Sequence, residues 1–332
     1  MKKLLSLLLS TVMLVAVVVG CSKKNEVNKI DPNKKEYSVA ILQVSTHTAL
    51  DGARNGFKDK LNEWARSKGK TIKYDEENAL GNAATETTMA DKIVSAQPDL
   101  ALGISTSSAR ALAGSTTKIP VLFTAVTDVK NELKGRNVTG TSDMVPIAKQ
   151  IDLINAIVEN CKKIALVYHT SEENSQKQVE IAKNRCKELG ITAVEYGVEN
   201  TNLIATTAQA IRSIGDIDAV YVPTDNMLAA NMPALCDELY GDSKSTKKIP
   251  VIAGESGMCE SGEALATLGL DYYKLGEQTA DIAIRILEGE TPSKIPFEYY
   301  KLECDVYVNE TNAAKLGYTE QKIADIKNFG KN

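Results

Sequence analysis

The amino-acid sequence predicts an α/β protein built from two lobes, each of them a doubly wound parallel sheet. From Tyr37 onward, β-rich runs alternate with helical patterns, which is typical of parallel sheets with helices on both faces. The alternation restarts near Ile147, and the motif Lys-Ile-Pro-Val occurs late in each half, at 118–121 and 248–251. A length of 332 residues also corresponds to about two domains.

The first half contains three strand–helix pairs and a fourth strand. Its clearest helix is Asp51–Ser67, where Phe57, Leu61 and Trp64 recur at helical spacing. The expected strands are 37–44, 71–74, 100–104 and 119–125, and the expected helices are 51–67, 82–96 and 107–113.

The second half repeats this pattern from a helix at 147–158. Gly190, Gly241 and Gly289 each follow a helical run, where glycine commonly ends a helix. The expected strands are 163–168, 191–196, 219–222 and 249–253, with a later strand ending near 269, and the expected helices are 147–158, 175–189, 203–214, 227–240 and 276–288.

Composition excludes several functional classes. Hydrophobic residues make up 43% and charged residues 25% of the chain, as in soluble globular proteins, which argues against disorder. The net charge of -4 argues against a nucleic-acid partner. The chain has only two histidines, His47 and His169, and both zinc sites and catalytic triads usually need histidine. We therefore expect no cofactor and no metal.

The N-terminus has the pattern of an export signal. Lys2 and Lys3 precede an apolar stretch, Leu4–Val19, which ends at Gly20-Cys21. Val-Val-Gly-Cys resembles a bacterial lipobox, so residues 1–20 are expected to be removed and Cys21 to be lipid-modified. An uncleaved membrane anchor is the alternative, but the apolar run is short for a spanning helix. Residues 21–36 are polar and lysine-rich, and we expect a flexible tether there.

Five cysteines follow Cys21, with no Cys-x-x-Cys pair among them. An odd number of widely spaced cysteines in a chain of this size favours isolated buried thiols over a disulfide framework.

Polar loops follow most of the predicted strands. Ligands of open α/β sheets bind beyond the carboxyl ends of the strands, so these loops should surround one cleft between the lobes. The first-lobe loops are rich in hydroxyl groups, and the second-lobe loops add the carboxylates Asp225 and Glu255. Such a cleft suits a zwitterion, with its carboxylate on Ser105, Thr106 or Thr46 and its ammonium on Asp225 or Glu255. Each loop taken singly is better explained by N-capping, and it is the six loops together that favour a binding cleft.

Catalytic motifs are not found. The first strand is not followed by Gly-x-Gly-x-x-Gly, and neither a Walker A sequence nor a Gly-x-Ser-x-Gly elbow occurs. We therefore expect a binding protein and not an enzyme.

Several motifs together resemble a known family, the substrate-binding lipoproteins of ABC transporters, of the type I periplasmic-binding-protein class, within the group that includes tryptophan and tyrosine transport proteins. The motifs that carry the resemblance are His47–Gly52 with Gly56-Phe57, Phe123–Asp128, Val138–Asp143, Glu173–Ser175, Thr224–Asn226 and Gly269–Gly276.

The resemblance implies a hinge of three strands between the lobes, with crossings near 140–141, 269–270 and 291–292. Lobe one would then comprise 37–139 plus 270–291, and lobe two 140–269 plus 292–332. It also implies an extracytoplasmic, lipid-anchored protein that closes on a small molecule and delivers it to a permease and its ATPase.

Carried over by position, the implied cleft residues come from both lobes. They are Thr46, Ser105, Thr106, Thr127, Asp128, Ser142, Asp143, Glu173, Ser175, Asp225, Asn226, Glu255 and Asp271, with Tyr168 and His47 expected to pack against a ligand side chain.

An amino acid, in particular an aromatic one, is the favoured ligand. A sugar or a nucleoside is the alternative, but aromatic residues are only 5% of the chain and the arginines lie outside the strand-end loops. The sequence leaves two other classes open. The protein would then be a component of a signalling receptor, or a lipid-anchored protein that binds a protein partner.

Overall fold

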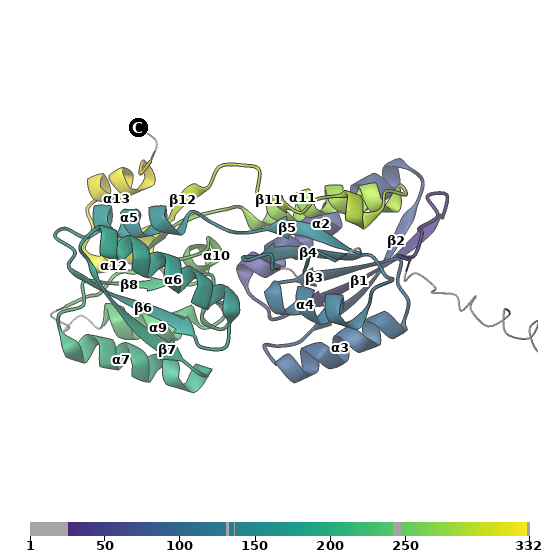
Figure 1. Cartoon of the computed structure of the whole chain (residues 1–332). Helices are drawn as coiled ribbons and strands as arrows, with labels where there is room; N and C mark the ends of the chain where they lie inside the picture. Colours follow the sequence, from purple (N-terminus) through teal and green to yellow (C-terminus); the bar gives the residue numbers. More distant parts are fainter. Residues whose placement is uncertain (1–25, 131–132, 136, 242–246, 331–332) are drawn as a thin grey trace, which may run out of the picture.

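The structure is a computed structural model that describes residues 26–130, 133–135, 137–241 and 247–330. The predicted signal peptide, 1–20, and Cys21 lie outside the described residues. Figure 1 shows two lobes side by side, each with a central sheet between helices. The predicted fold class is confirmed, because both sheets are almost entirely parallel and helices alternate with most of the strands.

The sheet of the first lobe has the strand order β11-β5-β4-β3-β1-β2, and all its pairings are parallel. β3 and β4 are buried along their whole length, which explains their continuous apolar sequences. The strands are β1 (Glu36–Gln43), β2 (Thr71–Asn78), β3 (Leu100–Ile104), β4 (Val121–Val126), β5 (Val138–Ser142) and β11 (Glu298–Tyr299).

The sheet of the second lobe has the order β12-β10-β9-β8-β6-β7, so it repeats the arrangement of the first. Only its edge strand β12 runs antiparallel, against β10. The strands are β6 (Lys163–His169), β7 (Thr192–Val198), β8 (Ala219–Val222), β9 (Val251–Ala253), β10 (Ala266–Gly269) and β12 (Asp305–Val308).

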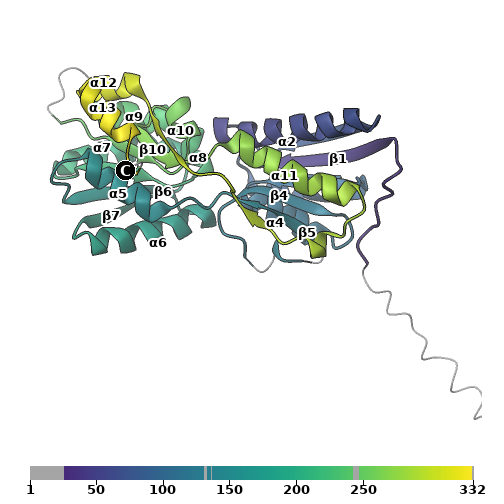
Figure 2. The same cartoon turned by 90° about the horizontal axis from the view of Figure 1, so that it is seen from above.

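Helices cover both faces of each sheet, because alternate strand residues are apolar on both sides. In β1, Val39 and Ile41 pack in one core with α2 (Thr48–Ser67) and α11 (Tyr272–Leu287). Ala40 and Leu42 pack on the other face with α3 (Ala83–Ser95) and α4 (Thr106–Ser115). Figure 2 shows α2 and α11 lying together along one side of the lobe.

The second lobe is built in the same way. α5 (Ile147–Ile157) and α6 (Glu173–Glu188) cover one face of its sheet, and α7 (Ile204–Ile214) and α9 (Met232–Tyr240) cover the other. Its short helices are α8 (Asn226–Ala229), α10 (Gly257–Glu260), α12 (Glu310–Leu316) and α13 (Glu320–Lys327), and a 3-10 turn lies at η2 (Thr201–Leu203). A second 3-10 turn, η3 (Pro292–Lys294), lies beside β5 of the first lobe.

Of the three crossings between the lobes, one lies clearly away from its expected position. β5 pairs with β4 as far as Ser142, so the first crossing lies just after the expected 140–141. The second lies between β10 and α11, close to the expected 269–270. The third follows Tyr299 and not 291–292. Ile295 is 3% exposed and its carbonyl accepts a hydrogen bond from Thr139 Oγ1 at 2.8 Å, which keeps this segment in the first lobe.

The expected flexible tether, 21–36, is held against the first lobe over its described part, from Glu26. Asn28 N donates to Lys118 O at 2.7 Å, and Lys34 forms an ion pair with Asp99 at 2.6 Å. Polar composition alone did not indicate these contacts.

Other differences concern element ends. β2 runs to Asn78 and not to 74, since its outer face tolerates polar residues at the sheet edge. The expected helix 227–240 is two helices, α8 and α9, and Pro233 lies in the first turn of α9. Helix α11 starts at Tyr272, four residues before the expected 276, because Asp271 caps it by accepting from Lys274 N at 3.1 Å.

The cysteines are placed as thiols within the lobes. Cys161, Cys186, Cys236 and Cys259 are buried and Cys304 is half-buried. Within the described residues, no helix is both long and apolar enough to cross a membrane.

Candidate functional site

A cavity of about 470 Å³ lies between the lobes, at the carboxyl ends of both sheets. This is the edge at which open α/β sheets bind ligands, and the volume is in the range of small-molecule sites. Its first-lobe lining is Val44, Ser45, Leu80, Gly81, Ala83, Glu86, Thr106, Ser107 and Arg110, and its second-lobe lining is His169, Ser171–Asn174, Glu199–Thr201, Asn226, Met227, Ala230 and Asn231.

The amino end of α4 forms the first-lobe wall. Ser105 precedes this helix with φ of 100°, an unusual backbone conformation for a serine, and its side chain makes no capping hydrogen bond. Gly103 permits the close approach of the helix, because a Cβ there would lie 2.6 Å from the backbone of Ala109. Thr106 and Ser107 at this helix start line the cavity, and the first amides of a helix have no partner within the helix itself.

Glu86 of α3 lies next to this helix end. Ser107 Oγ and Ser108 Oγ donate to its Oε1 at 3.0 and 2.5 Å. Burial raises the pKa of Glu86, and the negative charge of Glu172 across the cavity adds to this effect. The two hydroxyl hydrogen bonds oppose the shift without cancelling it.

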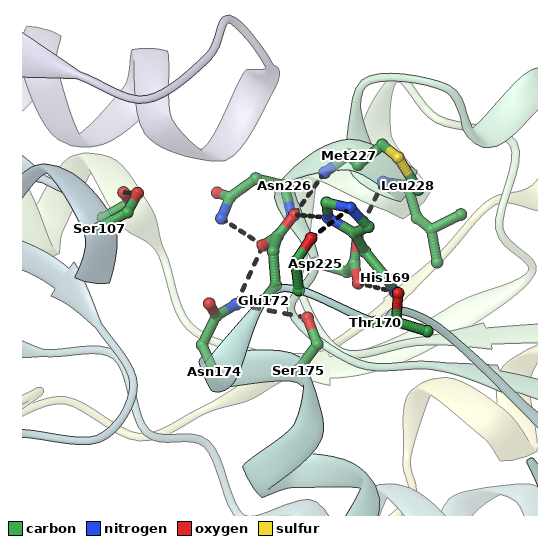
Figure 3. A network of polar contacts seen from close by, with 12 residues as sticks. Ser107, His169, Thr170, Glu172, Asn174, Ser175, Asp225, Asn226, Met227 and Leu228 are labelled. Atoms are coloured by element: carbon green, nitrogen blue, oxygen red, sulfur yellow. Dashed lines mark hydrogen bonds and ion pairs between the residues drawn. The ribbon is translucent and has the colours of Figure 1, made fainter. Parts of the chain in front are cut away.

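Glu172 organises the second-lobe wall. Its carboxylate accepts hydrogen bonds from Asn226 N, Asn226 Nδ2 and Met227 N at 2.9, 2.6 and 3.0 Å, and His169 Nδ1 lies 3.2 Å away (Figure 3). Burial alone would raise the pKa of Glu172, but these bonds, led by that of His169, lower it. Glu172 in turn raises the pKa of His169. Figure 3 shows Ser107 facing this network from the other lobe.

Asp225 lies behind this wall as a buried cap of α8. Its two oxygens accept from Leu228 N at 2.9 Å and from His169 N at 2.7 Å. Burial and the neighbouring Glu172 raise the pKa of Asp225 to about 7.

An ion pair of three residues bridges the lobes at the cavity wall. Glu173, in the first turn of α6, lies 2.7 Å from Arg110 and 2.5 Å from Lys130, which both belong to the first lobe. These two cations lower the pKa of Glu173.

The inner part of the lobe interface holds polar atoms without hydrogen-bond partners. His47 Nε2 lies 3.3 Å from Asn226 Oδ1, while His47 Nδ1 lies 3.7 Å from Glu255 Oε1. Because Asn226 Nδ2 already donates to Glu172, its Oδ1 must accept, which fixes the proton of His47 on Nε2 and leaves Nδ1 as an acceptor. In the described residues, His47 Nδ1, both oxygens of Glu255 and Ser45 Oγ are buried and have no partner.

Other carboxyl groups surround this part of the interface. Asp143 accepts from Thr127 Oγ1 at 3.0 Å and from Tyr272 OH at 2.8 Å. Burial raises the pKa of Glu255 well above its usual value, and the nearby Asp143, Glu260, Asp225 and Glu172 raise it further. The arrangement is suited to a ligand group that carries hydrogen-bond donors and a positive charge.

The residues named from the sequence fall into three groups. Thr106, Glu173 and Asn226 line the cavity, while His47, Asp143, Asp225 and Glu255 lie in the inner interface. Ser105, Thr127 and Ser142 are buried at strand ends and Ser175 is buried in the first turn of α6, where they support these walls.

The third group lies elsewhere. Tyr168, expected against the ligand, instead donates from its hydroxyl to Glu195 at 3.1 Å. Thr46 is exposed and accepts from Asn78 Nδ2 at 2.9 Å, Asp271 caps α11, and Asp128 is half-buried in the β4–β5 loop outside the cavity lining.

Sequence reasoning missed several lining residues, among them Glu86, Arg110 and Glu172. Glu172 directly precedes the expected Glu173 at the N-cap position of the same helix, which was a usable signal, although its side chain makes no capping hydrogen bond there. Arg110 follows Thr106 by one helical turn, so it reaches the cavity from outside the strand-end loop. Glu86 follows β2, whose real end at Asn78 was not expected.

Comparison with known proteins gives consistent matches. A family model described as ABC transporter substrate binding protein matches residues 38–324. The Tyrosine-binding protein of Clostridioides difficile (strain R20291) is 37% identical over 339 residues, which cover 98% of this chain and 95% of that protein.

Two solved structures are also similar over most of their length. The ABC domain in complex with L-Trp from Streptococcus pneumonia has 32% identity and a TM-score of 0.76, covering 86% of this chain and 98% of that one. A substrate binding protein with adhesive properties from Clostridium difficile, in a ligand-free, open structure, has 37% identity and a TM-score of 0.64, covering 86% and 96%. The present structure superposes better on the complex with L-Trp than on the ligand-free, open structure, despite the lower identity of the former.

Proposed function

The chain belongs to the family of ABC transporter substrate binding proteins, and from this premise we propose that its ligand is an aromatic L-amino acid bound between the lobes. Two relatives support this choice of ligand, since one is named for tyrosine binding and another is solved with L-Trp. The family match confirms the predicted resemblance, and the function of the protein is to bind a substrate for an ABC transporter.

The observation that carries the proposal is the unpartnered Glu255. This carboxyl group is 1% exposed, and neither of its oxygens has a hydrogen-bond partner among the described residues. A buried charge without a partner is strongly unfavourable, so the site calls for a cationic donor. A ligand ammonium has three N–H donors, and Glu255, His47 Nδ1 and Ser45 Oγ supply acceptors that lack a donor.

The carboxylate of the ligand would bind at the amino end of α4. Free amides at a helix start attract anions, and the hydroxyls of Thr106 and Ser107 stand beside them in the cavity lining. The side chain of the ligand would then extend along the apolar lining residues Leu80, Ala83 and Met227.

A thermal-shift and calorimetric series tests the proposal. L-Tyrosine, L-tryptophan and L-phenylalanine should raise the unfolding midpoint, since a ligand that binds only the folded state stabilises it by mass action. N-acetyl-L-tyrosine, which lacks the ammonium, and L-tyrosinamide, which lacks the carboxylate, should give little or no shift. Stabilisation by a sugar or a nucleoside, and not by any amino acid, would contradict the proposal.

The finer cellular context is also proposed. Residues 1–20 act as a signal peptide, Cys21 carries the lipid anchor outside the cytoplasm, and the closed lobes dock on a permease that works with an ATPase. The Lys2–Cys21 pattern supports the first two points. Detergent-phase partition of the expressed protein tests them: the wild type should enter the detergent phase, and a Cys21→Ser variant should not.

A further inference from the structure

The described chain begins as a strap, residues 26–35, that crosses the amino ends of three strands of the first sheet. Asn28 N donates to Lys118 O, just before β4, at 2.7 Å. Lys34 Nζ contacts both carboxylate oxygens of Asp99, just before β3, at 2.6 and 2.7 Å. Thr71 N, at the start of β2, donates to Lys35 O at 2.9 Å.

Lys70 fixes the middle of the strap from the other side. Its Nζ donates to Pro32 O and to Lys34 O at 2.7 Å each, and lies 5.1 Å from the ring centroid of Tyr37. Tyr37 OH donates to Asp31 O at 3.1 Å, and Ile30 packs against the hydrophobic core. Backbone, ionic and apolar contacts therefore hold the strap together along its length.

The place of the strap in the lobe has a clear consequence. The cavity lies at the carboxyl ends of the parallel strands, so their amino ends form the opposite pole of the lobe. Figures 1 and 2 show that the described chain begins at the end of the first lobe that is far from the second.

Five Cα–Cα steps separate Cys21 from Glu26, which at full extension span about 17 Å. We propose that the first lobe is the membrane-held lobe: the docked strap keeps its outer pole within this distance of the lipid on Cys21, and the second lobe moves when the cleft opens. The inference rests on the proposed acylation. If the chain were free as far as Glu36, fifteen Cα–Cα steps would separate it from Cys21, and the first lobe could lie about three times as far from the lipid. The docking of the strap therefore sets how close the first lobe stays to the membrane.

The charge of the segment agrees with this placement. Two lysines, Lys23 and Lys24, lie between Cys21 and the strap, and Lys29 lies in the strap. Lysines close to a bilayer are attracted by anionic head groups.

Energy transfer to labelled lipids tests the proposal. The acylated protein is reconstituted in vesicles that contain anionic lipid and a head-group acceptor dye, with a donor on an unnatural amino acid at position 118 or 162. Lys118 and Lys162 are both exposed and lie at the outer poles of the first and second lobe. Transfer should be stronger from position 118. A Gly/Ser insertion of about 20 residues between Asn25 and Glu26 should abolish the difference, because such linkers behave as flexible coils.

Equal transfer from both positions at the native spacing would overturn the inference. Vesicle flotation tests separately whether the protein is attached to the lipid. A protein that does not float with the vesicles lacks the proposed acylation, and this would also overturn the inference. Hydrogen exchange tests the docking of the strap without any lipid. The Asn28 amide should exchange slowly in the wild type and faster in Lys34→Ala. Lys35→Ala, at an exposed neighbour, is the matched control. Fast exchange of this amide in wild type would also overturn the inference.

Discussion

His47 and Glu255 come from different lobes, and their side chains meet where the lobes close. Burial lowers the pKa of His47 and raises that of Glu255, so the closed, ligand-free pair is favoured in its neutral form. Asp143, Asp225, Glu172 and Glu260 add negative charge around Glu255, which strengthens this preference. An arriving ammonium would reverse it, because a carboxylate then gains a cationic partner and releases its proton.

The Glu255→Gln variant should bind the proposed amino-acid ligand about 10- to 100-fold more weakly, as expected when one hydrogen bond between charged groups is lost. Wild-type affinity should also increase as the pH rises toward the raised pKa of ligand-free Glu255, because binding releases a proton below that pH. The variant should lose this dependence. Isothermal titration calorimetry between pH 5 and pH 8 measures both effects.

Glu260→Gln is the matched control for Glu255→Gln, since it removes a neighbouring carboxylate on α10 that is exposed. Its affinity should stay close to that of wild type. An equal loss in both variants would indicate a general electrostatic effect and would argue against an ammonium site at Glu255.

Residue-level expectations agree with the lining of the cavity where a side chain lies in the loop that follows a strand. Asn226 and Thr106 follow β8 and β3, and both line the cavity. Arg110 and Glu86 reach the cavity from inside helices, and periodicity cannot say which helix face points to a cleft until the lobes are assembled. Tyr168 lies one residue before the end of β6. Successive residues of a strand point to opposite faces of the sheet, and the hydroxyl of Tyr168 bonds to Glu195.

Among the helices, α2 and α11 approach each other most closely through two glycines. A Cβ at Gly276 would lie 2.0 Å from Ala53 O, and one at Gly56 would lie 2.0 Å from Tyr273 O. Neither neighbour can move away cheaply, because both are backbone atoms of a helix.

Gly276→Ala should therefore lower the free energy of unfolding by about 1–3 kcal/mol, the usual cost of overpacking. Gly114→Ala is the matched control: Gly114 lies inside α4 with nothing near its Cβ position, so alanine should stabilise by about 0.5–1 kcal/mol. Urea unfolding of ligand-free protein measures both. A neutral Gly276→Ala would mean that the two helices separate without cost.

Helix α6 bears the cross-lobe ion pair of Glu173 with Arg110 and Lys130. Glu173→Gln should speed ligand dissociation about two- to fivefold, in keeping with partly exposed ion pairs, and should reduce the effect of salt on the dissociation rate. Stopped-flow fluorescence or a displacement assay gives the rate.

Glu188→Gln controls for charge on the same helix, because Glu188 pairs with Arg185 within the second lobe at 2.8 Å. If Glu173→Gln and Glu188→Gln dissociate alike, the bridge does not hold the lobes closed.

At the level of elements, the alternation of strands and helices followed from periodicity, and the main errors were at edges and crossings. β11 has two residues, and nothing local distinguishes it from a loop; its assignment depends on pairing with β5. The docked strap depends in the same way on Asp99 and Lys118, which are remote in sequence. Such contacts exist only once the sheet has formed.

The two lobes form a cleft, and a ligand that binds at its inner polar residues, as proposed, can enter only when the cleft opens. The inner polar residues are almost fully buried in the closed arrangement, with Glu255 1% and His47 9% exposed. Three crossing segments connect the lobes, and apart from them Thr48 Oγ1 of α2 contacts Ser261 Oγ, next to α10. This contact joins opposite lobes at the start of α2 and the end of α10.

A disulfide at this contact should lock the closed state. In the double variant Thr48→Cys/Ser261→Cys, oxidation without ligand should nearly abolish the binding of radiolabelled L-tyrosine, whereas oxidation after loading should retain the bound label through gel filtration. Reduction should restore exchange in both cases, because the lobes can then separate. The single variants control for the substitutions and for the native thiols, four of which are buried. If the oxidised, empty protein still bound L-tyrosine at the wild-type rate, the ligand would not enter through the interlobe cleft, and a binding site between the lobes would have to be abandoned.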